Sequence, residues 1–335
     1  MALQKPSPEF LELLKKSGSN NRAESETFSD EIAKAIQLPL REGLLAGDIA
    51  SDIFERIVMA PGSSTEFPID LLSPGEESDF VAYVAPSHGR VPERTVEGDY
   101  VMVPTYTIRN SIDWLLRYAR EARWDIISRA TQVFEAGFVK KINDDCWHTI
   151  LAAGVDRGIQ VYDADAAAGQ FTKRLVSLMK VVMRRNAGGN STSIKRGQLT
   201  DVYLSPEGVE DMRNWGVDQL DETSRREIYV ANDGAGSVSR VFGVNINAID
   251  ELGEGQEYQN YYATNLSGTL GPSSDVELVM GLDLSSNDSF IMPVKEELVI
   301  HNDPFLHRQG RGGIYGQIEI GVGILDTRRV LVGSF

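Results

Sequence analysis

Histidine is the side chain best suited to acid–base and metal chemistry near neutral pH, and the four in this chain lie far apart: His88, His148, His301 and His307. None belongs to a Gly-x-Ser-x-Gly, His-Glu-x-x-His or Walker-type motif. His301, Asn302, Asp303 and His307 can be drawn as a metal site, but they lie in a proline-containing loop without helical spacing. The sequence therefore predicts no enzyme, no catalytic residue, no metal site and no cofactor.

A second group of residues that could do acid–base chemistry lies within one turn of an expected helix. Asp144, Asp145 and His148 could act as acid–base partners, but a solvated polar helix face explains them more simply. The only cysteine, Cys146, falls within the apolar pattern of the same helix. A single cysteine excludes a disulfide framework and a cysteine metal cluster, so we expect Cys146 to be buried.

Charge gives the next constraint. The formal net charge is −16, which argues against unaided wrapping of nucleic acid, although a container for DNA benefits from a surface to which its cargo does not stick. The densest basic patch is formed by Arg184-Arg185 and Lys195-Arg196, which flank a Gly-Asn-Ser loop. A helix C-terminus favours cations and accounts for the first pair, and a phosphate contact is the less favoured alternative.

The clearest periodic pattern covers residues 108–152. Apolar residues recur there in steps of three and four, no proline interrupts them, and a continuous helix would be about 65 Å long. Charged residues cover the remaining surface, which excludes a membrane span. Such a helix can serve as a strut between distant parts of a subunit. The alternative is a long core helix or coiled-coil arm of another α+β protein.

The amino terminus lacks a secretory signal, so we expect the protein to be made and kept in a cytoplasm.

The residues before this helix differ in character. Residues 1–25 contain one short apolar cluster followed by Ser17-Gly18-Ser19-Asn20-Asn21, which predicts a flexible arm that something else must order. Short helices are expected at 29–36 and 40–59, separated by Pro39. At 60–107 the apolar residues change from the period of a helix to the two-residue period of a strand. Six prolines in this segment favour an edge ribbon or a projecting hairpin with its tip near residues 86–92. This segment is too long for a simple connection, so we expect it to find its partner on another subunit.

The residues after the helix alternate between helix and strand patterns. A strongly amphipathic helix is expected at 170–186 and a strand at 199–204. Ser205, Pro206 and Glu207 have the residue types of an N-cap and first helical turn, and that helix should reach about Trp215. Further strands are expected at 227–231, 238–249, 276–282, 290–294, 297–301, 314–325 and 329–332.

This order of elements, together with four phrases, resembles the major capsid proteins of tailed bacteriophages, which have the Hong Kong 97-type fold. Residues 199–212 resemble the family's strand-to-helix step, and 242–249 resemble its "G-x-P-V" strand without the proline. Residues 279–285 resemble the "fGD-s" turn, with Leu282 where the aspartate is usual. Residues 316–330 resemble the final strand and the "D-x-R-A" ending. The resemblance covers about residue 38 to the end of the chain.

The resemblance implies an α+β chain with an N-terminal arm, an extended β-hairpin called the E-loop, a spine-helix P-domain and an axial A-domain. The implied N-terminal arm is 1–37, and the P-domain comprises 38–59, the spine helix 105–156 and a strand at 300–323. The E-loop is 60–104, and the A-domain is 157–299 with a C-terminal strand at 324–335. The E-loop side chains expected to contact a neighbouring subunit are Phe67, Ile69, Phe80, Tyr83, Arg90 and Arg94.

The implied function is that of a major capsid protein. Such subunits assemble as pentamers and hexamers into an icosahedral virion shell around double-stranded DNA, without sequence-specific binding and without a membrane, in the cytoplasm of the host bacterium. The partners implied are other copies of the chain, with a scaffold, portal, decoration or cement protein beside them. The alternatives are an encapsulin nanocompartment shell protein and, in another class, an α+β enzyme or binding protein whose hairpin folds back onto its own domain.

One departure from the prototype of the family concerns covalent linkage. In that prototype an E-loop lysine forms an isopeptide bond with an asparagine of a neighbouring subunit. Here no lysine occurs between Lys34 and Lys140, so the hairpin lacks the amine. Arg90 and Arg94 can form ion pairs but cannot replace it, because a guanidinium stays protonated. The sequence therefore predicts a shell held by non-covalent contacts.

Overall fold

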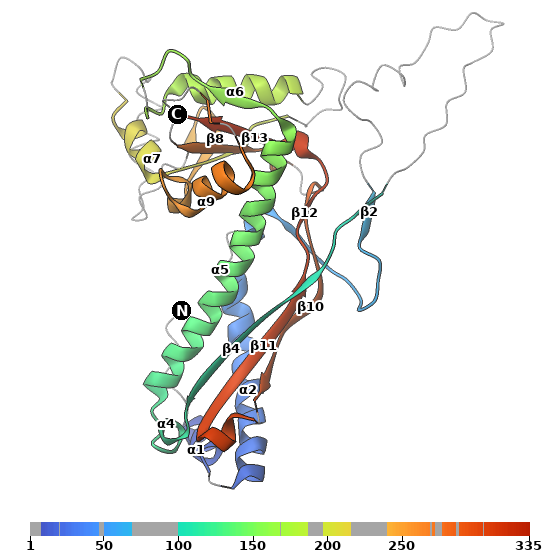
Figure 1. Ribbon diagram of the computed structural model, residues 1–335, viewed down its shortest axis with the longest axis vertical. Helices are drawn as coiled ribbons and strands as arrows, with labels where there is room; N and C mark the ends of the chain where they lie inside the picture. The colour runs from blue at the N-terminus through green and yellow to red at the C-terminus, as the bar shows by residue number, and fades with distance from the viewer. Residues whose placement is uncertain are drawn as a thin grey trace, which may run out of the picture. The chain divides into compact units, whose positions relative to one another are not determined.

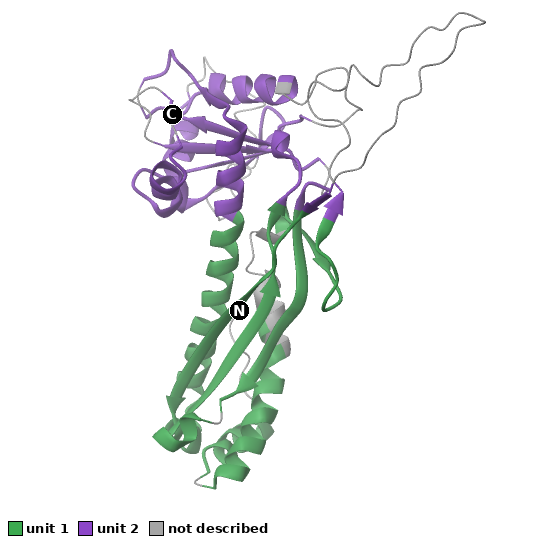
Figure 2. Cartoon of the chain, turned by 45° about the vertical axis from the view of Figure 1, so that its right-hand side comes forward, with its two compact units in different colours: residues 1–66, 102–146, 291–323 green, residues 67–101, 147–290, 324–335 purple. Residues whose placement is uncertain are grey.

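The computed structural model describes residues 8–19, 21–46, 50–68, 100–167, 169–186, 197–215, 240–268, 270–271, 277–285, 288–303 and 305–335. The chain divides into two units, each built from segments far apart in the sequence. Unit 1 contains residues 1–66, 102–146 and 291–323, and unit 2 contains residues 67–101, 147–290 and 324–335 (Figure 2). Long helices and largely separate sheets confirm the α+β fold class.

Unit 1 is a sheet packed on a long helix. The sheet has the strand order β1-β10-β11-β4, formed by β1 (Glu55–Val58), β10 (Phe290–Asn302), β11 (Arg311–Ile320) and β4 (Tyr106–Leu115). β11 pairs antiparallel with both β10 and β4, whereas β1 pairs parallel with β10. The short β12 (Gly323–Ile324) also pairs with β10, and a 3-10 turn, η4 (Leu306–Gln309), precedes β11. The helix is α5 (Trp124–Arg157), which runs beside the sheet (Figure 1).

A close contact between β11 and α5 fixes the packing of unit 1. Ile127 and Phe134 on α5 are buried, and so is Ile314 on β11. Gly316 on β11 lies against the Phe134 ring, where an added Cβ would come within 2.8 Å of a ring carbon. The Asn110 side-chain amide on β4 donates a hydrogen bond to the carbonyl oxygen of Phe134, at 3.2 Å. A larger residue at position 316 would therefore push the sheet away from the helix.

The helix predicted for 108–152 begins later than expected. Tyr106–Leu115 is strand β4, α4 (Leu116–Arg120) follows, and a turn with Ala122 at φ +51° leads into α5. The prediction was wrong here because a four-residue step such as Ile108 to Ile112 fits one helical turn and also two strand repeats. Residues 106–115 form a strand because they pair with β11, which lies far along the chain. With 34 residues, α5 is about 51 Å long.

The predicted flexible N-terminal arm also needs correction. Pro8–Ser17 forms helix α1, and α2 (Arg22–Ala46) follows after a short turn. Leu14 is fully buried, and the Phe10 ring meets the Trp124 ring edge-on at 4.9 Å between centroids. Arg120 Nε donates to the carbonyl oxygen of Gly18 at 2.7 Å. The apolar cluster of this segment is thus ordered by unit 1 of the same chain, through partners more than 100 residues away in the sequence.

The two short helices predicted around Pro39 are one helix, because α2 continues through that position. A proline inside a helix costs about 3 kcal/mol, and packing must offset this cost. Ile36 and Leu40 are buried, and Gln37 Nε2 donates to the carbonyl oxygen of Leu298 at 3.2 Å. The predicted helix over 40–59 instead ends at Ala46, and α3 (Ala50–Ile53) and strand β1 follow.

Unit 2 contains a six-stranded sheet of order β5-β13-β9-β6-β8-β7. Antiparallel neighbours are β13 and β9, β9 and β6, and β8 and β7, while β13 pairs parallel with β5 and β6 pairs parallel with β8. The strands are β5 (Gln160–Tyr162), β6 (Asp201–Leu204), β7 (Arg240–Val241), β8 (Val244–Ala248), β9 (Leu278–Leu282) and β13 (Val330–Ser334). The helices and turns are α6 (Lys173–Asn186), α7 (Pro206–Arg213), η2 (Asp250–Leu252), α9 (Glu257–Asn260), η3 (Tyr261–Asn265) and η5 (Thr327–Arg329).

Several local predictions are confirmed in unit 2. The amphipathic helix is α6, whose Leu175 and Met179 are buried in the core with Val202 of β6. Ser205 caps α7 by accepting a hydrogen bond from the backbone N–H of Gly208 at 3.2 Å. The strand expected at 227–231 lies outside the described residues. Those at 290–294 and 297–301 are one continuous strand, β10.

Every helix in the described part of the chain is too short or too polar to cross a membrane. The predicted burial of Cys146 is confirmed, since its side chain is enclosed in the core. The buried face of α5 extends into unit 2, where Trp147 and Ile150 are also enclosed. One helix therefore supplies apolar side chains to both cores.

The buried face of α5 gives the first testable prediction. Ile127→Asp places a carboxylate at a fully buried position, so we expect a loss of about 3–5 kcal/mol in the free energy of unfolding and an insoluble product. Val133→Asp is the matched control, because Val133 lies on the same helix and is 66% exposed. Urea unfolding of the control should differ from wild type by about 0.5 kcal/mol or less. A soluble Ile127→Asp with the same midpoint as the control would contradict the packing described above.

Candidate functional site

The base of the predicted projecting hairpin is a small two-stranded sheet. Strand β2 (Glu66–Pro68) leads out, strand β3 (Tyr100–Met102) returns, and the Val103 N–H donates to the Thr65 carbonyl oxygen at 3.0 Å. Tyr100 and Met102 are 63% and 66% exposed, respectively. Adjacent large apolar side chains on so short a ribbon are a feature of contact surfaces rather than of a solvated loop.

The predicted E-loop contact residues remain largely untested. Phe67 lies in β2 and is half-buried. The others lie outside the described residues: Ile69, Phe80, Tyr83, Arg90 and Arg94. Their role in contacting a neighbouring subunit therefore stays a prediction.

Unit 1 contains a hollow between the first half of β4 and the middle of α5. Its volume is about 410 Å³, and its lining includes Ile108 and Asn110 from the strand with Gly137 and Phe138 from the helix. A Cβ added at Gly137 would meet the Asn110 side-chain nitrogen at 2.7 Å, so glycine allows the close approach that shapes the hollow. β4 pairs with β11 on one side, and among the described residues no strand pairs with its other edge.

A polar network lies at one end of this hollow. The Tyr106 hydroxyl donates to Asp145 Oδ2 at 2.7 Å, and Lys141 Nζ lies 2.7 Å from Asp145 Oδ1. Burial, together with the Asp145 hydrogen bond and charge, raises the pKa of the Tyr106 phenol, so the hydroxyl stays protonated and remains a donor. The polar face predicted for Asp144, Asp145 and His148 thus includes a carboxylate that ties α5 to β4.

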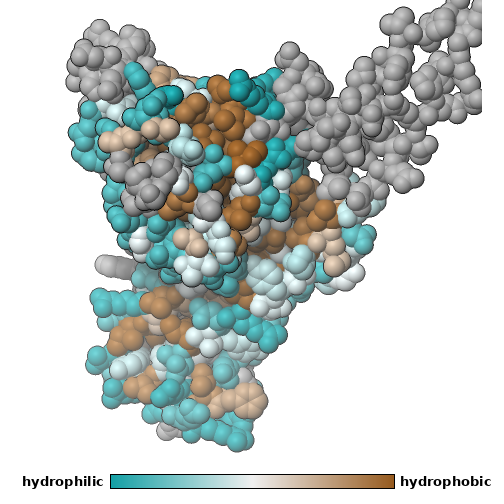
Figure 3. Space-filling view, turned by 45° about the horizontal axis from the view of Figure 1, so that its top comes forward, coloured by the Kyte–Doolittle hydropathy of each residue, from teal (hydrophilic) through white to brown (hydrophobic). Residues whose placement is uncertain are grey.

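Figure 3 shows hydrophobic side chains reaching the surface between hydrophilic ones on both units. The exposed large hydrophobic residues include Val58 and Phe305 in unit 1 and Val181 and Phe242 in unit 2. The Phe305 turn is held by a hydrogen bond from its own N–H to Asp303 Oδ1 at 3.0 Å. An exposed aromatic side chain held in a fixed turn, as Phe305 is, is a favourable contact point between proteins, because little entropy is lost when it is buried.

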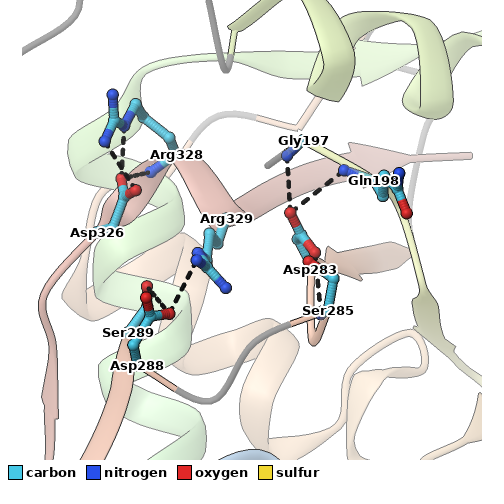
Figure 4. Close-up of polar contacts among 9 residues, drawn as sticks. All are labelled: Gly197, Gln198, Asp283, Ser285, Asp288, Ser289, Asp326, Arg328 and Arg329. Carbon is cyan, nitrogen blue, oxygen red and sulfur yellow. Dashed lines mark hydrogen bonds and ion pairs between the residues drawn. The ribbon is translucent and has the colours of Figure 1, made fainter. Parts of the chain in front are cut away.

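In unit 2, a buried carboxylate joins two segments of the sheet. Asp283 follows β9 and is completely buried, and its Oδ2 accepts hydrogen bonds from the backbone N–H groups of Gly197 and Gln198 at 2.7 and 3.2 Å (Figure 4). Its Oδ1 accepts a third from the Ser285 N–H at 3.0 Å. The Asp283 N–H itself donates to the Arg329 carbonyl oxygen. These bonds fix the chain at the start of the segment that leads into β6.

The C-terminal arginines complete this network. Arg329 is buried and lies 2.8 Å from Asp288, while Arg328 forms two hydrogen bonds with the Asp326 carboxylate at 2.7 and 2.9 Å (Figure 4). The turn at 279–285 and the ending at 316–330 are separate segments of the sequence, and the structure brings them together. The turn's carboxylate is Asp283, one position after Leu282. An aspartate followed two residues later by a serine is the local signal that marks this turn.

The described histidines take part in packing contacts. His148 stacks on Tyr261 with 3.7 Å between ring centroids, and His301 stacks on Tyr315 at 5.1 Å. Nε2 of His307 lies 3.3 Å from a backbone carbonyl oxygen in the α1–α2 turn. Among the described residues, no three His, Cys, Asp or Glu side chains are grouped so that they could hold a metal ion.

A buried acid beside α7 shows how electrostatics shape unit 2. The Ser205 hydroxyl hydrogen-bonds to the Glu277 carboxylate as well as capping the helix. Burial raises the pKa of the Glu277 carboxyl, the Ser205 hydrogen bond lowers it, and the nearby negative charges of Glu207 and Asp211 raise it further. The hydroxyl thus links the residue before β9 to the start of α7.

The Asp283 network gives a second prediction. Asp283→Asn keeps the shape of the side chain but replaces one carboxylate oxygen with a donor that faces other donors. We expect a loss of about 2–3 kcal/mol in the free energy of unfolding, measured by denaturant titration. Asp165→Asn is the control, because the Asp165 side chain is 74% exposed in a surface ion pair and should contribute less than about 1 kcal/mol. Equal losses in the two variants would show that the Asp283 bonds do not hold unit 2 together.

The sequence matches no protein-family model and no curated protein. Solved structures do match it. A chain from Microbacterium phage Oxtober96 superposes with a TM-score of 0.55 at 10% identity, covering 86% of this chain and 90% of that one. The capsid of an empty GTA particle superposes with a TM-score of 0.55 at 13% identity, covering 86% and 90%. The mature capsid of bacteriophage PhiM1 superposes with a TM-score of 0.51 at 12% identity, covering 86% of both chains.

At identities this low, the likeness lies in the arrangement of the elements rather than in particular side chains. The arrangement includes a long helix packed on a long sheet, the base of a hairpin that lies between strands β1 and β4 in sequence, and a second unit with its own sheet. The chain has the Hong Kong 97-type fold of phage major capsid proteins.

Proposed function

We propose that this protein is the major capsid protein of a tailed bacteriophage, which self-assembles as pentamers and hexamers into an icosahedral shell enclosing double-stranded DNA. The observation that carries the proposal is the Hong Kong 97-type fold over 86% of the chain, shared with the capsids of the GTA particle and of phage PhiM1. The shell belongs to the virion and forms in the cytoplasm of the host bacterium. Its main partner is another copy of the chain, and a scaffold, a portal and a decoration or cement protein are further partners.

The surfaces of the chain support assembly. The hairpin base presents Tyr100 and Met102 to solvent, and the open edge of β4 borders a hollow lined by Ile108 and Phe138. A projecting ribbon on one copy and an open strand edge on another form a heterologous pair, the type of contact that closes into rings about an axis. We propose that the E-loop, residues 60–104, is the arm that reaches the neighbour. Phe67, Ile69, Phe80 and Tyr83 would be its apolar contacts and Arg90 and Arg94 its polar ones.

A nanocompartment shell that loads protein cargo is the second candidate. The expected flexible N-terminal arm favoured the phage capsid, but residues 8–17 and 22–46 are helices instead. That distinction between the two shells therefore falls away. The contents of purified particles separate them, because a phage capsid co-purifies with double-stranded DNA after packaging and a nanocompartment co-purifies with protein.

The hairpin gives the third prediction. Deleting residues 73–94 removes the arm but leaves β2 and β3, so the subunit should stay soluble and folded while shells are lost. Negative-stain microscopy and size-exclusion chromatography measure both outcomes. A second variant, Phe80→Ser with Tyr83→Ser, keeps the length and should reduce the yield of shells if apolar docking drives assembly. Normal shells from the deletion variant would rule out the arm as an assembly contact.

The missing lysine gives the fourth prediction. The chain has no lysine from residue 35 to residue 139, so an E-loop amine is not available for an isopeptide bond. Particles boiled in detergent should therefore run as a single band near the monomer mass of 36.9 kDa on a denaturing gel. A ladder of pentamer and hexamer bands would contradict non-covalent assembly and direct attention to lysines elsewhere, such as Lys140 or Lys295.

A further inference from the structure

We propose that the solvent face of α6 is a contact site for the phosphate backbone of double-stranded DNA. The inference builds on the proposed function, because it assigns one surface of the shell protein to its cargo. It concerns charge and geometry alone and requires no recognition of base sequence.

The composition of α6 is opposite in sign to that of the chain. The chain has 49 acidic and 33 basic residues, yet five of the 14 residues of this helix are Lys or Arg and none is Asp or Glu. The helix C-terminus accounts for Arg184 and Arg185, since cations there interact favourably with the helix dipole. It does not account for Lys173 or Lys180, because the dipole effect is confined to the last turn and Lys173 begins the helix, where cations are unfavourable.

The cations of α6 lie on one face in two rows. At 100° per residue, Lys173, Lys180 and Arg184 fall on one line, and Arg174 and Arg185 fall on a second line beside it. All five are exposed, whereas Leu175, Val176, Met179 and Met183 on the opposite face are buried in the unit 2 core. Along the first line the backbone positions are separated by about 10 Å and about 6 Å, and flexible side chains of this length can follow a phosphate backbone over such intervals.

Arg174 and Lys180 each hold a neighbouring segment in place. Arg174 faces Asp163 and Asp165, which anchor the first turn of the helix. Lys180 Nζ donates to the carbonyl oxygen of Phe242 at 2.8 Å, which holds a residue at φ +51° in the turn between β7 and β8. Arg240, two residues before Phe242, is exposed as well. Because two carboxylates neutralise its charge, Arg174 is counted as a structural residue. The exposed side chains of Lys173, Lys180, Arg184 and Arg185 form the cationic face that we assign to DNA.

A local basic face can bind DNA although the chain as a whole is acidic. At physiological salt the Debye length is about 8 Å, so charges elsewhere on the chain are screened while contacts on the face are not. Four phosphate contacts predict a slope near −3.6 for the logarithm of affinity against the logarithm of salt concentration, and hence a loss of about 100-fold in affinity between about 50 and 200 mM salt. The acidic remainder of the surface would keep such binding weak and reversible, as a packaged genome requires.

A protein partner is less well suited to the same face. The buried centre of a protein–protein interface is depleted in lysine, whereas Lys173 and Lys180 are among the exposed cations of α6. Val181 and Phe242 are the large hydrophobic residues exposed at this part of the described structure, and each is close to half-exposed. Isolated apolar side chains of this kind are ordinary on protein surfaces. A row of exposed cations on one helix face favours a polyanion.

The test uses the unassembled full-length chain and a short random-sequence DNA duplex carrying a fluorescent label. The test variant is Lys173→Gln with Arg184→Gln and Arg185→Gln; Lys180 is kept because it holds the Phe242 turn. The control is Lys15→Gln with Lys34→Gln and Arg129→Gln, which removes three exposed cations from unit 1 and changes the net charge equally. Fluorescence anisotropy is measured over a range of salt concentrations, and circular dichroism checks that each variant is folded.

We expect the wild type and the control to bind with the same steep salt dependence, and the α6 variant to lose at least tenfold in affinity and about 2–3 units of slope. Absence of binding by the wild type, or equal slopes for the two variants, would overturn the proposal. An α6 variant that binds DNA normally but no longer forms shells in negative stain would also overturn it and would assign α6 to a protein interface. Shell formation is scored separately, so failure of this inference is distinguishable from failure of the proposed capsid function.

Discussion

The close approach of β11 to α5 is the constraint on which unit 1 depends. Gly316 lets the strand lie directly on the Phe134 ring, and Asn110 of the neighbouring strand bonds to the carbonyl oxygen of the same residue. Because β11 pairs with β10 on one side and β4 on the other, the position of β11 sets the position of the whole sheet. The hollow beside β4 follows from that arrangement, because it lies between β4 and α5.

Unit 2 uses buried polar bonds where unit 1 uses a close apolar contact. Asp283 satisfies backbone donors that would otherwise be enclosed without partners, and Arg329 is buried beside Asp288. A buried carboxylate is costly, but the three backbone donors that Asp283 satisfies define one arrangement of the chain, because few alternatives bring all three within reach of one carboxylate. The basic side chains on the outer face of α6 are exposed. The cations on that face lie opposite the apolar residues that secure the helix to the sheet.

The candidate site was predictable from sequence only in part. The exceptional proline content of 60–107 and its extended period indicated a projecting hairpin, and the structure describes the paired base of that hairpin. The absence of lysine there is a property of sequence alone. Asp283 was missed because its partners, Gly197 and Gln198, are more than 80 residues away and contribute backbone groups, which carry no sequence signal. The cations of α6 are visible in the sequence. That they share one exposed face follows only from the structure, which buries the apolar side of the helix in the unit 2 core.

By itself the sequence determined the features whose causes are local. The amphipathic period of α6 and the Ser205 cap of α7 depend on residues within one or two helical turns, so they could be predicted correctly. Only the tertiary structure decided the features whose partners are remote. The apolar pattern of residues 106–115 fits both a helix and a strand, and pairing with β11 makes them a strand. Residues 8–17 are an ordered helix because Phe10 packs on Trp124 and Arg120 bonds to the turn that follows the helix. The physical reason is that an apolar pattern specifies a face to be buried, whereas the element that buries it comes from elsewhere in the chain.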